Sequence, residues 1–389
     1  MKKTNCIITI LFLAFLVLVS AGSFIMEDRE FSPNENRYLA EFPEMSVDNI
    51  LSGSFQDGLE EYLKDQLWFR DKWITVKTGI QKACGNTDIG GAYVGKEGYD
   101  FEKITPEDVD EKLVARNIKA VSGYFDYASE TIDNARLSFL LVPTSGLIMA
   151  DKLPEHARLF KQSGYIAQVK KNMEDYQFID VRKELLAHNK EYIYYKTDHH
   201  WTMDGAYLAY KKWCDSTGHP YEDKDILEKN VVSYNFRGSL YSKILDADSE
   251  SDSIWTYSPE GNAPYAAHCS VTIDNKDTMT GCFDNSKLQE KDKYAYFFGG
   301  NYGEVHISSV PDGKTDTGRN LLVIKDSFAN CFVPLVTMDY DHIYMVDLRY
   351  YNGDMKTYLG DHDITDVLVL YNISNFISDR NLFKLTKGM

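Results

Sequence analysis

Two short segments contain residues whose types and spacing suit acid–base and nucleophilic chemistry. The first is Thr197–Trp201, with the sequence Thr-Asp-His-His-Trp. In an extended segment Asp198 and His200 point to the same side of the chain. A turn then lets Asp198 accept a hydrogen bond from His200, which fixes the imidazole tautomer and prepares a general base. The alternatives are a structural histidine, or an aspartate that caps a following helix.

The second segment is Leu321–Asn330, in which an apolar run enters Asp326 and Ser327 and a helix-compatible run follows. A serine at a strand-to-helix turn lies at the carboxyl edge of a parallel sheet, where such folds place ligands. The helix N-terminus offers free N–H groups and a partial positive charge. These features suit a nucleophile whose attack creates an oxyanion. The alternative is an ordinary helix cap.

Further residues are candidates for the oxyanion hole or for the lining of a cleft. The backbone N–H of Ser327 is the first candidate donor. The second is the segment Gly299-Gly300-Asn301, because an amide side chain and a flexible backbone suit that role, although an ordinary turn is the competing interpretation. Arg237 and Tyr371 are predicted to line the cleft.

Metal binding is the rival chemistry for the histidine segment. Asp198, His199 and His200 are possible ligands of a divalent ion, and residues 361–363 (Asp-His-Asp) would add more. The second group falls in a polar stretch, where a solvated turn is favoured. None of the six cysteines forms a Cys-x-x-Cys pair. We therefore predict neither a metal nor another cofactor.

The pattern of apolar runs predicts the elements that position these residues. Helices are expected over 54–82, 109–131, 165–176 and 201–217, and strands over 137–142, 178–181, 321–324, 343–346 and 367–370. Strands alternating with helices indicate an α/β fold with a mostly parallel sheet. Residues 235–318 are rich in Ser, Asp, Asn and Gly and are interpreted as a β-rich insertion, with strand candidates at 270–273 and 294–298.

The N-terminus predicts an exported protein. Lys2 and Lys3 precede an uncharged, largely apolar run from Ile7 to Ile25, long enough to cross a bilayer. We expect a signal anchor over 1–27 whose positive end stays in the cytoplasm, although a cleaved signal peptide remains an alternative. A stalk over 28–53 and an α/β domain over 54–389 would follow. Outside the cell Cys269 and Cys282 could pair, although buried free thiols are favoured.

The composition excludes several classes of protein. The 389 residues are 43% hydrophobic and 26% charged, which rules out wholesale disorder. With 42 basic and 59 acidic residues the formal net charge is −17. Most of this surface would repel a phosphate backbone, so nucleic acid is not an expected partner.

Together the two segments resemble the DHHW-motif family of Gram-positive bacteria, which is similar to the periplasmic alginate O-acetyltransferases of the SGNH-hydrolase-like group. The resemblance implies an SGNH-hydrolase-like three-layer sandwich with the β-rich insertion and an N-terminal transmembrane helix. Five blocks carry it: Glu35–Ala40 with Phe42-Pro43, Asp65 with Phe69-Arg70, Gly95–Tyr99, Lys196–Trp201 and Ile324–Ala329.

Residue by residue, the resemblance implies that Ser327 is the nucleophile, His200 the general base and Asp198 the orienting acid. Their order along the chain is the permuted arrangement of the acetyltransferase branch. Lys325 stands where the alginate enzymes have glycine. Its side chain is expected to narrow the approach to Ser327 or to place a cation near an anionic substrate.

The expected function is a membrane-anchored, extracytoplasmic O-acetyltransferase of the Gram-positive cell surface. Its acceptor would be an exported or cell-wall polysaccharide. The resemblance also implies a multi-pass membrane O-acyltransferase as the acyl donor. Two alternatives stay open: a carbohydrate acetyl-esterase with the same three residues, and an inactive glycan-binding or scaffold component of an export complex.

Overall fold

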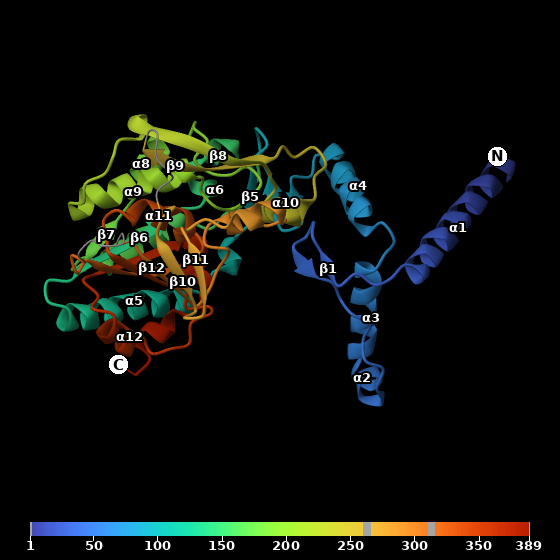
Figure 1. Cartoon of the computed structure of the whole chain (residues 1–389). Coiled ribbons are helices and arrows are strands. Elements are labelled where there is room, and N and C mark those ends of the chain that lie inside the picture. The colour runs from blue at the N-terminus through green and yellow to red at the C-terminus, as the bar shows by residue number, and fades with distance from the viewer. Residues whose placement is uncertain (1, 260–265, 310–315, 389) are drawn as a thin grey trace. The chain divides into compact units, whose positions relative to one another are not determined.

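The computed structural model describes residues 2–259, 266–309 and 316–388 (Figure 1). The chain divides into two compact units. Unit 1 comprises Met1–Gly90 with Tyr241–Ser249, and unit 2 comprises Gly91–Leu240 with Glu250–Met389. Residues 54–90 thus cluster with the N-terminal part of the chain, and the domain limits drawn from the sequence remain a prediction.

Unit 1 is mainly helical. Helix α1 (Lys2–Ile25) contains the one segment, among the described residues, that is long and apolar enough to cross a membrane. The prediction of a single helix over 54–82 is wrong in one respect, because this segment forms two helices. Phe69 lies between them in the left-handed conformation (φ 56°), which a right-handed helix cannot continue. The other elements are β1 (Phe31–Ser32), β2 (Arg37–Tyr38), α2 (Val47–Ser52), α3 (Ser54–Asp65) and α4 (Arg70–Ala83).

An ion-pair cluster holds the segment around β2 against α3 and α4. Asp65 is 2% exposed and accepts hydrogen bonds from the Arg37 guanidinium and from the backbone N–H of Ala40. Arg70 pairs with Glu35. The motif residues at 35–40, 65 and 70 therefore hold unit 1 together.

Unit 2 is a mixed α/β fold around one eight-stranded sheet. Its strand order is β11-β10-β12-β14-β13-β15-β6-β7. The pairs from β14 through β13, β15 and β6 to β7 are parallel, and the pairs that join β14, β12, β10 and β11 are antiparallel. The bounds are β6 (Arg136–Val142), β7 (Gln177–Ile179), β10 (Ser270–Ile273), β11 (Asp277–Thr280), β12 (Glu304–Ser308), β13 (Asn320–Lys325), β14 (His342–Val346) and β15 (Asp366–Asn372).

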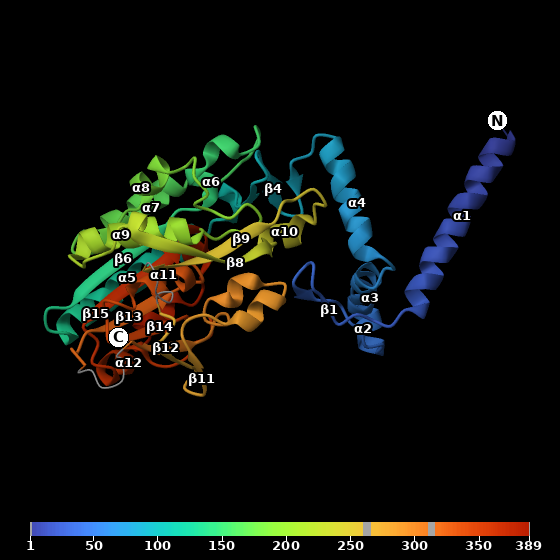
Figure 2. The same ribbon diagram turned by 45° about the horizontal axis from the view of Figure 1, so that its top comes forward.

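Both faces of the sheet are covered, which explains the continuous apolar strands. On β6, Leu140 and Val142 belong to one buried cluster, and Phe139 and Leu141 to the other. Helices α9 and α11 lie on the first face, and α5 and α12 on the second (Figures 1 and 2). The helices of these two layers are α5 (Glu111–Thr131), α7 (Gln162–Lys171), α9 (Met203–Thr217), α11 (Ala329–Val336), α12 (Met355–Asp361) and α13 (Ile373–Ser378).

The segment predicted as a β-rich insertion contributes to the main sheet. Strands β10, β11 and β12 lie within it and extend the sheet in antiparallel register, while β8 (Leu227–Phe236) and β9 (Asp252–Pro259) form a separate hairpin. The strand predicted at 294–298 is wrong: Lys293–Tyr296 is a 3-10 helix, η5. This geometry turns Tyr294 inward, to 5% exposure.

Shorter elements complete the described chain. Cys269 and Cys282 are buried free thiols in contact with each other. The remaining bounds are β3 (Asp88–Ile89), β4 (Ala92–Val94), β5 (Asp100–Glu102), η1 (Pro106–Asp108), α6 (Ser145–Ile148), η2 (Ala150–Lys152), α8 (Arg182–Ala187), η3 (Lys224–Ile226), α10 (Ser239–Ile244), η4 (Asn285–Gln289) and η6 (Leu382–Thr386).

Candidate active site

Asp198, His200 and Ser327 form a continuous hydrogen-bonded chain. His200 Nδ1 lies 2.6 Å from Asp198 Oδ1, and His200 Nε2 lies 2.7 Å from Ser327 Oγ. An ionised carboxylate only accepts hydrogen bonds, so Nδ1 carries the proton and Nε2 is free to accept from the serine hydroxyl. All three side chains are buried, with Ser327 the most accessible at 7%.

Asp198 is held by backbone N–H groups on both sides. One oxygen accepts from the N–H of His200 at 3.0 Å, and the other accepts from the N–H of Ser239 at 2.8 Å. Gly238 makes this approach possible, because a Cβ on it would lie 2.3 Å from the Asp198 carboxylate. The segment 237–239 therefore orients the acid.

The extended segment before α9 is tied down by Asp252. This buried carboxylate accepts from the backbone N–H groups of Lys196 and Thr197, each at 2.8 Å, and from the Thr197 hydroxyl. Thr202 then caps α9 with its side chain, so the histidine segment ends where the helix begins. The helix predicted over 201–217 is confirmed over Met203–Thr217, and it ends at Gly218, whose φ is 77°.

Ser327 lies in the turn between β13 and α11, at the edge where β6, β13 and β15 all end. Asp326 closes this turn: its carboxylate accepts from the N–H groups of Phe328 and Asn372 and from the Asn375 amide. The indole N–H of Trp201 donates to the carbonyl of Phe328 at 3.0 Å. The two motif segments are thus linked through the fully buried Trp201.

Aromatic rings enclose His200. Tyr294 stacks on the imidazole with ring centroids 3.9 Å apart and an interplanar angle of 11°. Its hydroxyl donates to the carbonyl of Ser327 at 3.1 Å. Phe328 also packs against the imidazole, with its ring centroid 4.9 Å from that of His200. The base therefore has few rotamers available to it.

Burial and charge set the protonation states at neutral pH. Burial is the largest influence on His200 and lowers its pKa to about 4, with His199 adding to the effect and Asp198 opposing it. Burial opposes ionisation of Asp198, but the two histidines and the hydrogen bonds from His200 and Ser239 hold its pKa well below the usual range. An ionised Asp198 beside a neutral His200 is the state expected of a general base in waiting.

The same segment contains the one group of three possible metal ligands in the described ranges. Ligand atoms of Asp198, His199 and His200 lie within 4.8 Å of one another. Each already has a protein partner, since His199 Nδ1 contacts the Ser239 hydroxyl at 2.7 Å and both nitrogens of His200 are used. Residues 361–363 do not join this group; His362 Nδ1 instead contacts the carbonyl of Tyr358.

Lys325 does not point into open space beside the serine. Its side chain is 2% exposed, and its ammonium donates to Asn301 Oδ1 at 2.9 Å and to Asn330 Oδ1 at 2.8 Å. Gly299, with a φ of 77°, begins the turn that brings Asn301 there, and its carbonyl accepts from Tyr302. The candidate oxyanion segment and the serine turn are therefore joined through Lys325.

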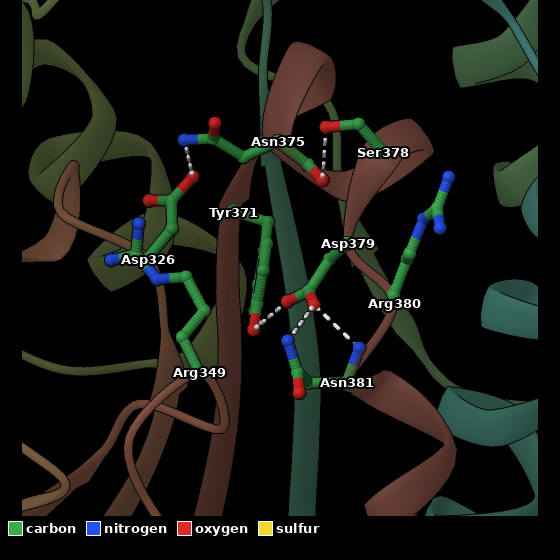
Figure 3. A pocket seen from close by; sticks show the side chains of 8 residues that line it. All are labelled: Asp326, Arg349, Tyr371, Asn375, Ser378, Asp379, Arg380 and Asn381. Carbon is green, nitrogen blue, oxygen red and sulfur yellow. Dashed lines mark hydrogen bonds between the residues drawn. The ribbon is translucent and has the colours of Figure 1, made fainter. Parts of the chain in front are cut away.

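Of the two predicted lining residues, Arg237 belongs to the segment that holds Asp198, whereas Tyr371 faces a cavity that the three-residue chain does not line. Tyr371 borders a cavity of about 290 Å³ beside Asp326, where its hydroxyl faces Asp379 (Figure 3). The backbone carbonyl of Arg237 accepts from Lys291 at 2.7 Å. The cavity is lined by Asp326, Arg349, Tyr371, Asn375, Ser378, Asp379, Arg380 and Asn381.

Four residues that support the site have no signal in the sequence that singles them out. Tyr294 and Asn330 act through contacts across the fold, and Ser239 acts through its backbone. Asp252 lies 54 residues beyond Asp198. The one hint was Arg237, a predicted lining residue that lies two positions before Ser239.

Comparisons with known proteins bear on the family and the fold of this chain. The family model described as DHHW protein matches residues 163–346. No curated protein matches the chain. A crystal structure of a DHHW family protein from Eubacterium siraeum DSM 15702 is 23% identical, covers 77% of this chain and 96% of its own, and has a TM-score of 0.60.

Two further solved structures are similar. Bacillus cereus PatB1 with a sulfonyl adduct is 22% identical, covers 75% of this chain and 98% of its own, and has a TM-score of 0.59. The O-acetyltransferase domain of Pseudomonas putida AlgJ is 12% identical, covers 77% of this chain and 99% of its own, and has a TM-score of 0.47. At these identities the first likeness shows the fold, and the second is too distant to support an argument about this chain. Residues 163–346, which include Asp198, His200 and Ser327, therefore carry the pattern of the DHHW family.

Proposed function

We propose that this protein is a membrane-anchored O-acyltransferase that acetylates hydroxyl groups of an exported or cell-wall polysaccharide. The observation that carries the proposal is the hydrogen-bonded chain from Asp198 through His200 to Ser327, with contacts of 2.6 and 2.7 Å. A serine hydroxyl needs an adjacent base to become nucleophilic, and the base needs a third group to orient it.

The reaction has two halves. In the first, Ser327 Oγ attacks the carbonyl carbon of an acetyl donor while His200 Nε2 takes the hydroxyl proton, and the donor's leaving group departs with that proton. In the second, His200 takes the proton of an acceptor hydroxyl, and the acceptor oxygen attacks the acyl carbon. The bond to Ser327 Oγ then breaks as the imidazolium returns its proton to that oxygen. Asp198 stabilises the imidazolium formed in each half.

Two features support the exported, anchored setting. Helix α1 is long and apolar enough to span a membrane, and two lysines precede the apolar run. Positive residues favour the cytoplasmic side, which would leave the domain with Ser327 outside the cell. The SGNH-hydrolase-like fold, the polysaccharide acceptor and a multi-pass membrane protein as acyl donor come from the family resemblance.

The test is covalent labelling of residues 27–389 followed by intact-mass measurement. The wild type, Ser327→Ala and His200→Ala are incubated with a fluorophosphonate and separately with 4-nitrophenyl acetate. A His219→Gln variant is the matched control, because His219 is a buried histidine outside the site. We expect one adduct in the wild type and the control, and none in the two site variants.

A second arm separates transfer from hydrolysis. The wild type is given 4-nitrophenyl acetate together with an oligosaccharide, and the sugar products are analysed by mass. Acetylated oligosaccharide supports the proposal. Adduct formation followed only by release of acetate would instead make the protein an esterase, and an absence of any Ser327-dependent adduct would favour the inactive glycan-binding alternative.

A further inference from the structure

Lys325 is a buried cation, and the orientation of the two side-chain amides that it contacts follows from its chemistry. Its three N–H bonds can only donate, so the atoms it contacts on Asn301 and Asn330 must be carbonyl oxygens. These contacts measure 2.9 and 2.8 Å. Because Asn330 Oδ1 faces the ammonium, its Nδ2 is free to donate to Asn301 Oδ1, at 3.1 Å.

Asn301 Oδ1 therefore accepts from two donors at once. The amide nitrogen of Asn301 must point the other way, and Asn301 is an exposed residue although both of its partners are buried. Lys325 lies two residues before Ser327 and Asn330 three residues after it. The network thus ties the exposed amide to the turn that holds the serine.

The balance of charge around Lys325 is consistent with a fixed position. Asp347 is fully buried, lies 3.8 Å from the ammonium and is already bound by the Arg349 guanidinium. Burial lowers the pKa of Lys325 to about 8, so the cation is retained at neutral pH. A buried ammonium without hydrogen-bond acceptors would be unfavourable. The carboxamide oxygens of Asn301 and Asn330 therefore stay directed at Lys325.

We propose that Lys325 is a positioning residue that locks the Asn301 carboxamide so that its Nδ2 serves as an oxyanion donor. The inference rests on the proposed function, since it assigns a donor to the acyl-enzyme reaction of Ser327. The cation acts through Asn301 and does not contact the substrate. A neutral side chain at position 325 would let the carboxamide turn over and present oxygen to the developing negative charge.

The test is a double-mutant cycle on turnover of 4-nitrophenyl acetate by residues 27–389. The variants are Lys325→Met, Asn301→Asp and the two combined. Asn301→Asp keeps an oxygen for Lys325 and Asn330 but removes the Nδ2 donor. Loss of one oxyanion donor costs roughly 100- to 1,000-fold in kcat. We expect each single variant to lose at least tenfold in kcat and the combined variant to lose no more than the worse single one.

The control is Lys152→Met, which removes another buried lysine of the same unit, paired with Glu97 at 3.3 Å. Its kcat should stay within about twofold of the wild type, because its side chain contacts Glu97 and Tyr99 and not Ser327, Asn301 or Asn330. If Lys325→Met fails to fold, Asn330→Asp replaces it, because a carboxylate there attracts Asn301 Nδ2 and should also lower kcat at least tenfold.

The outcomes separate this inference from the proposed function. A Ser327-dependent adduct with an unchanged kcat in Lys325→Met, or in Asn330→Asp where that variant replaces it, overturns the positioning role and leaves the acyl-enzyme in place. Losses that multiply in the combined variant also overturn it, since Lys325 would then act independently of Asn301. Absence of the adduct in the wild type overturns the proposed function itself.

Discussion

Two buried histidines of unit 2 lie beside an aspartate and a hydroxyl group, yet they are opposite in tautomer. His200 donates from Nδ1 to Asp198 at 2.6 Å and accepts at Nε2 from Ser327. His219 accepts at Nδ1 from Arg319 at 3.1 Å, so its proton is on Nε2, which faces the Tyr340 hydroxyl. Asp339 is 3.7 Å from His219, beyond hydrogen-bond distance.

The difference shows that a nearby aspartate and hydroxyl group are not enough to make a histidine a general base. An arginine neighbour occupies the lone pair that catalysis would need, so His219 is a structural group stacked on Trp213. Position along α11 also matters. Ser327 precedes this helix, where N–H groups converge, whereas Asp339 follows it, where carbonyl groups lie.

Removing the nucleophile or the base should have the largest effect. Ser327→Ala and His200→Ala should each abolish the fluorophosphonate adduct, because Ser327 supplies the reacting oxygen and His200 the base hydrogen-bonded to it. His219→Gln should label at the wild-type rate. Intact mass after timed incubation measures all three. Equal labelling of Ser327→Ala and wild type would contradict the assignment.

Replacing Asp198 or Asp339 tests what the aspartate beside each histidine contributes. Asp198→Asn keeps the shape but removes the acceptor that holds the proton on Nδ1, and a triad that loses this acceptor slows by about 10⁴-fold. Asp339→Asn should alter the labelling rate less than about twofold, since this buried carboxylate contacts Tyr210 and His219 and neither Ser327 nor His200. Stopped labelling time courses give both rates. Comparable slowing in the two variants would show that Asp198 has no larger role in labelling than Asp339.

Gly238→Ala tests the support behind Asp198. The added Cβ would lie 2.3 Å from the carboxylate, so the acid or the backbone must move. A displacement of about 1 Å in a catalytic constellation costs on the order of 100-fold in rate. The control is Gly164→Ala, where a Cβ meets nothing within 4 Å. A labelling rate for Gly238→Ala equal to that of the control would show that the close approach is not required.

The pH dependence tests the protonation state of His200. Its pKa is lowered to about 4, so the neutral base predominates above that value and is lost as pH falls through it. The labelling rate should be flat from pH 8 to pH 5 and then fall about tenfold per pH unit below 4, as a single protonation requires. Circular dichroism at each pH checks that the fold persists. A midpoint near 6.5 would mean that burial does not shift this histidine.

Tyr294→Phe should have the smallest effect. The ring still stacks on His200, but the hydrogen bond from the hydroxyl to the Ser327 carbonyl is lost. One neutral hydrogen bond is worth about 1 kcal/mol, so we expect a loss of a few-fold in kcat and a slightly lower melting temperature. A Tyr294→Ala variant removes the stacking as well and should lose more. Equal rates for the two variants would assign the effect to the hydroxyl alone.

Much of the fold follows from short apolar runs. The strands at 137–142, 321–324, 343–346 and 367–370 were predicted within two residues of β6, β13, β14 and β15. Such runs are recognisable because both faces of these strands are buried. The strand predicted at 294–298 is wrong because burial alone does not identify a strand. The aromatic residues of this segment are buried by tertiary contacts of a 3-10 helix, not by a sheet.

The site divides in the same way. Asp198 and His200 lie two residues apart, so their hydrogen bond was predictable from local geometry. His200 and Ser327 are 127 positions apart, which allows no such argument, and the family resemblance supplied the pairing. The direction of Lys325 was not predictable, because a side chain at a strand end can face the cleft or the interior.

The sequence by itself determined the α/β alternation of segments, the Asp198–His200 pair and a serine at a strand-to-helix turn, because each depends on residues close together in the chain. Two features came from the tertiary structure alone: Tyr294 stacks on His200, and Lys325 turns inward to Asn301 and Asn330. Those outcomes depend on strand order and side-chain packing between distant segments. No local spacing encodes them, since burial of a charge is acceptable only where the fold brings its acceptors together.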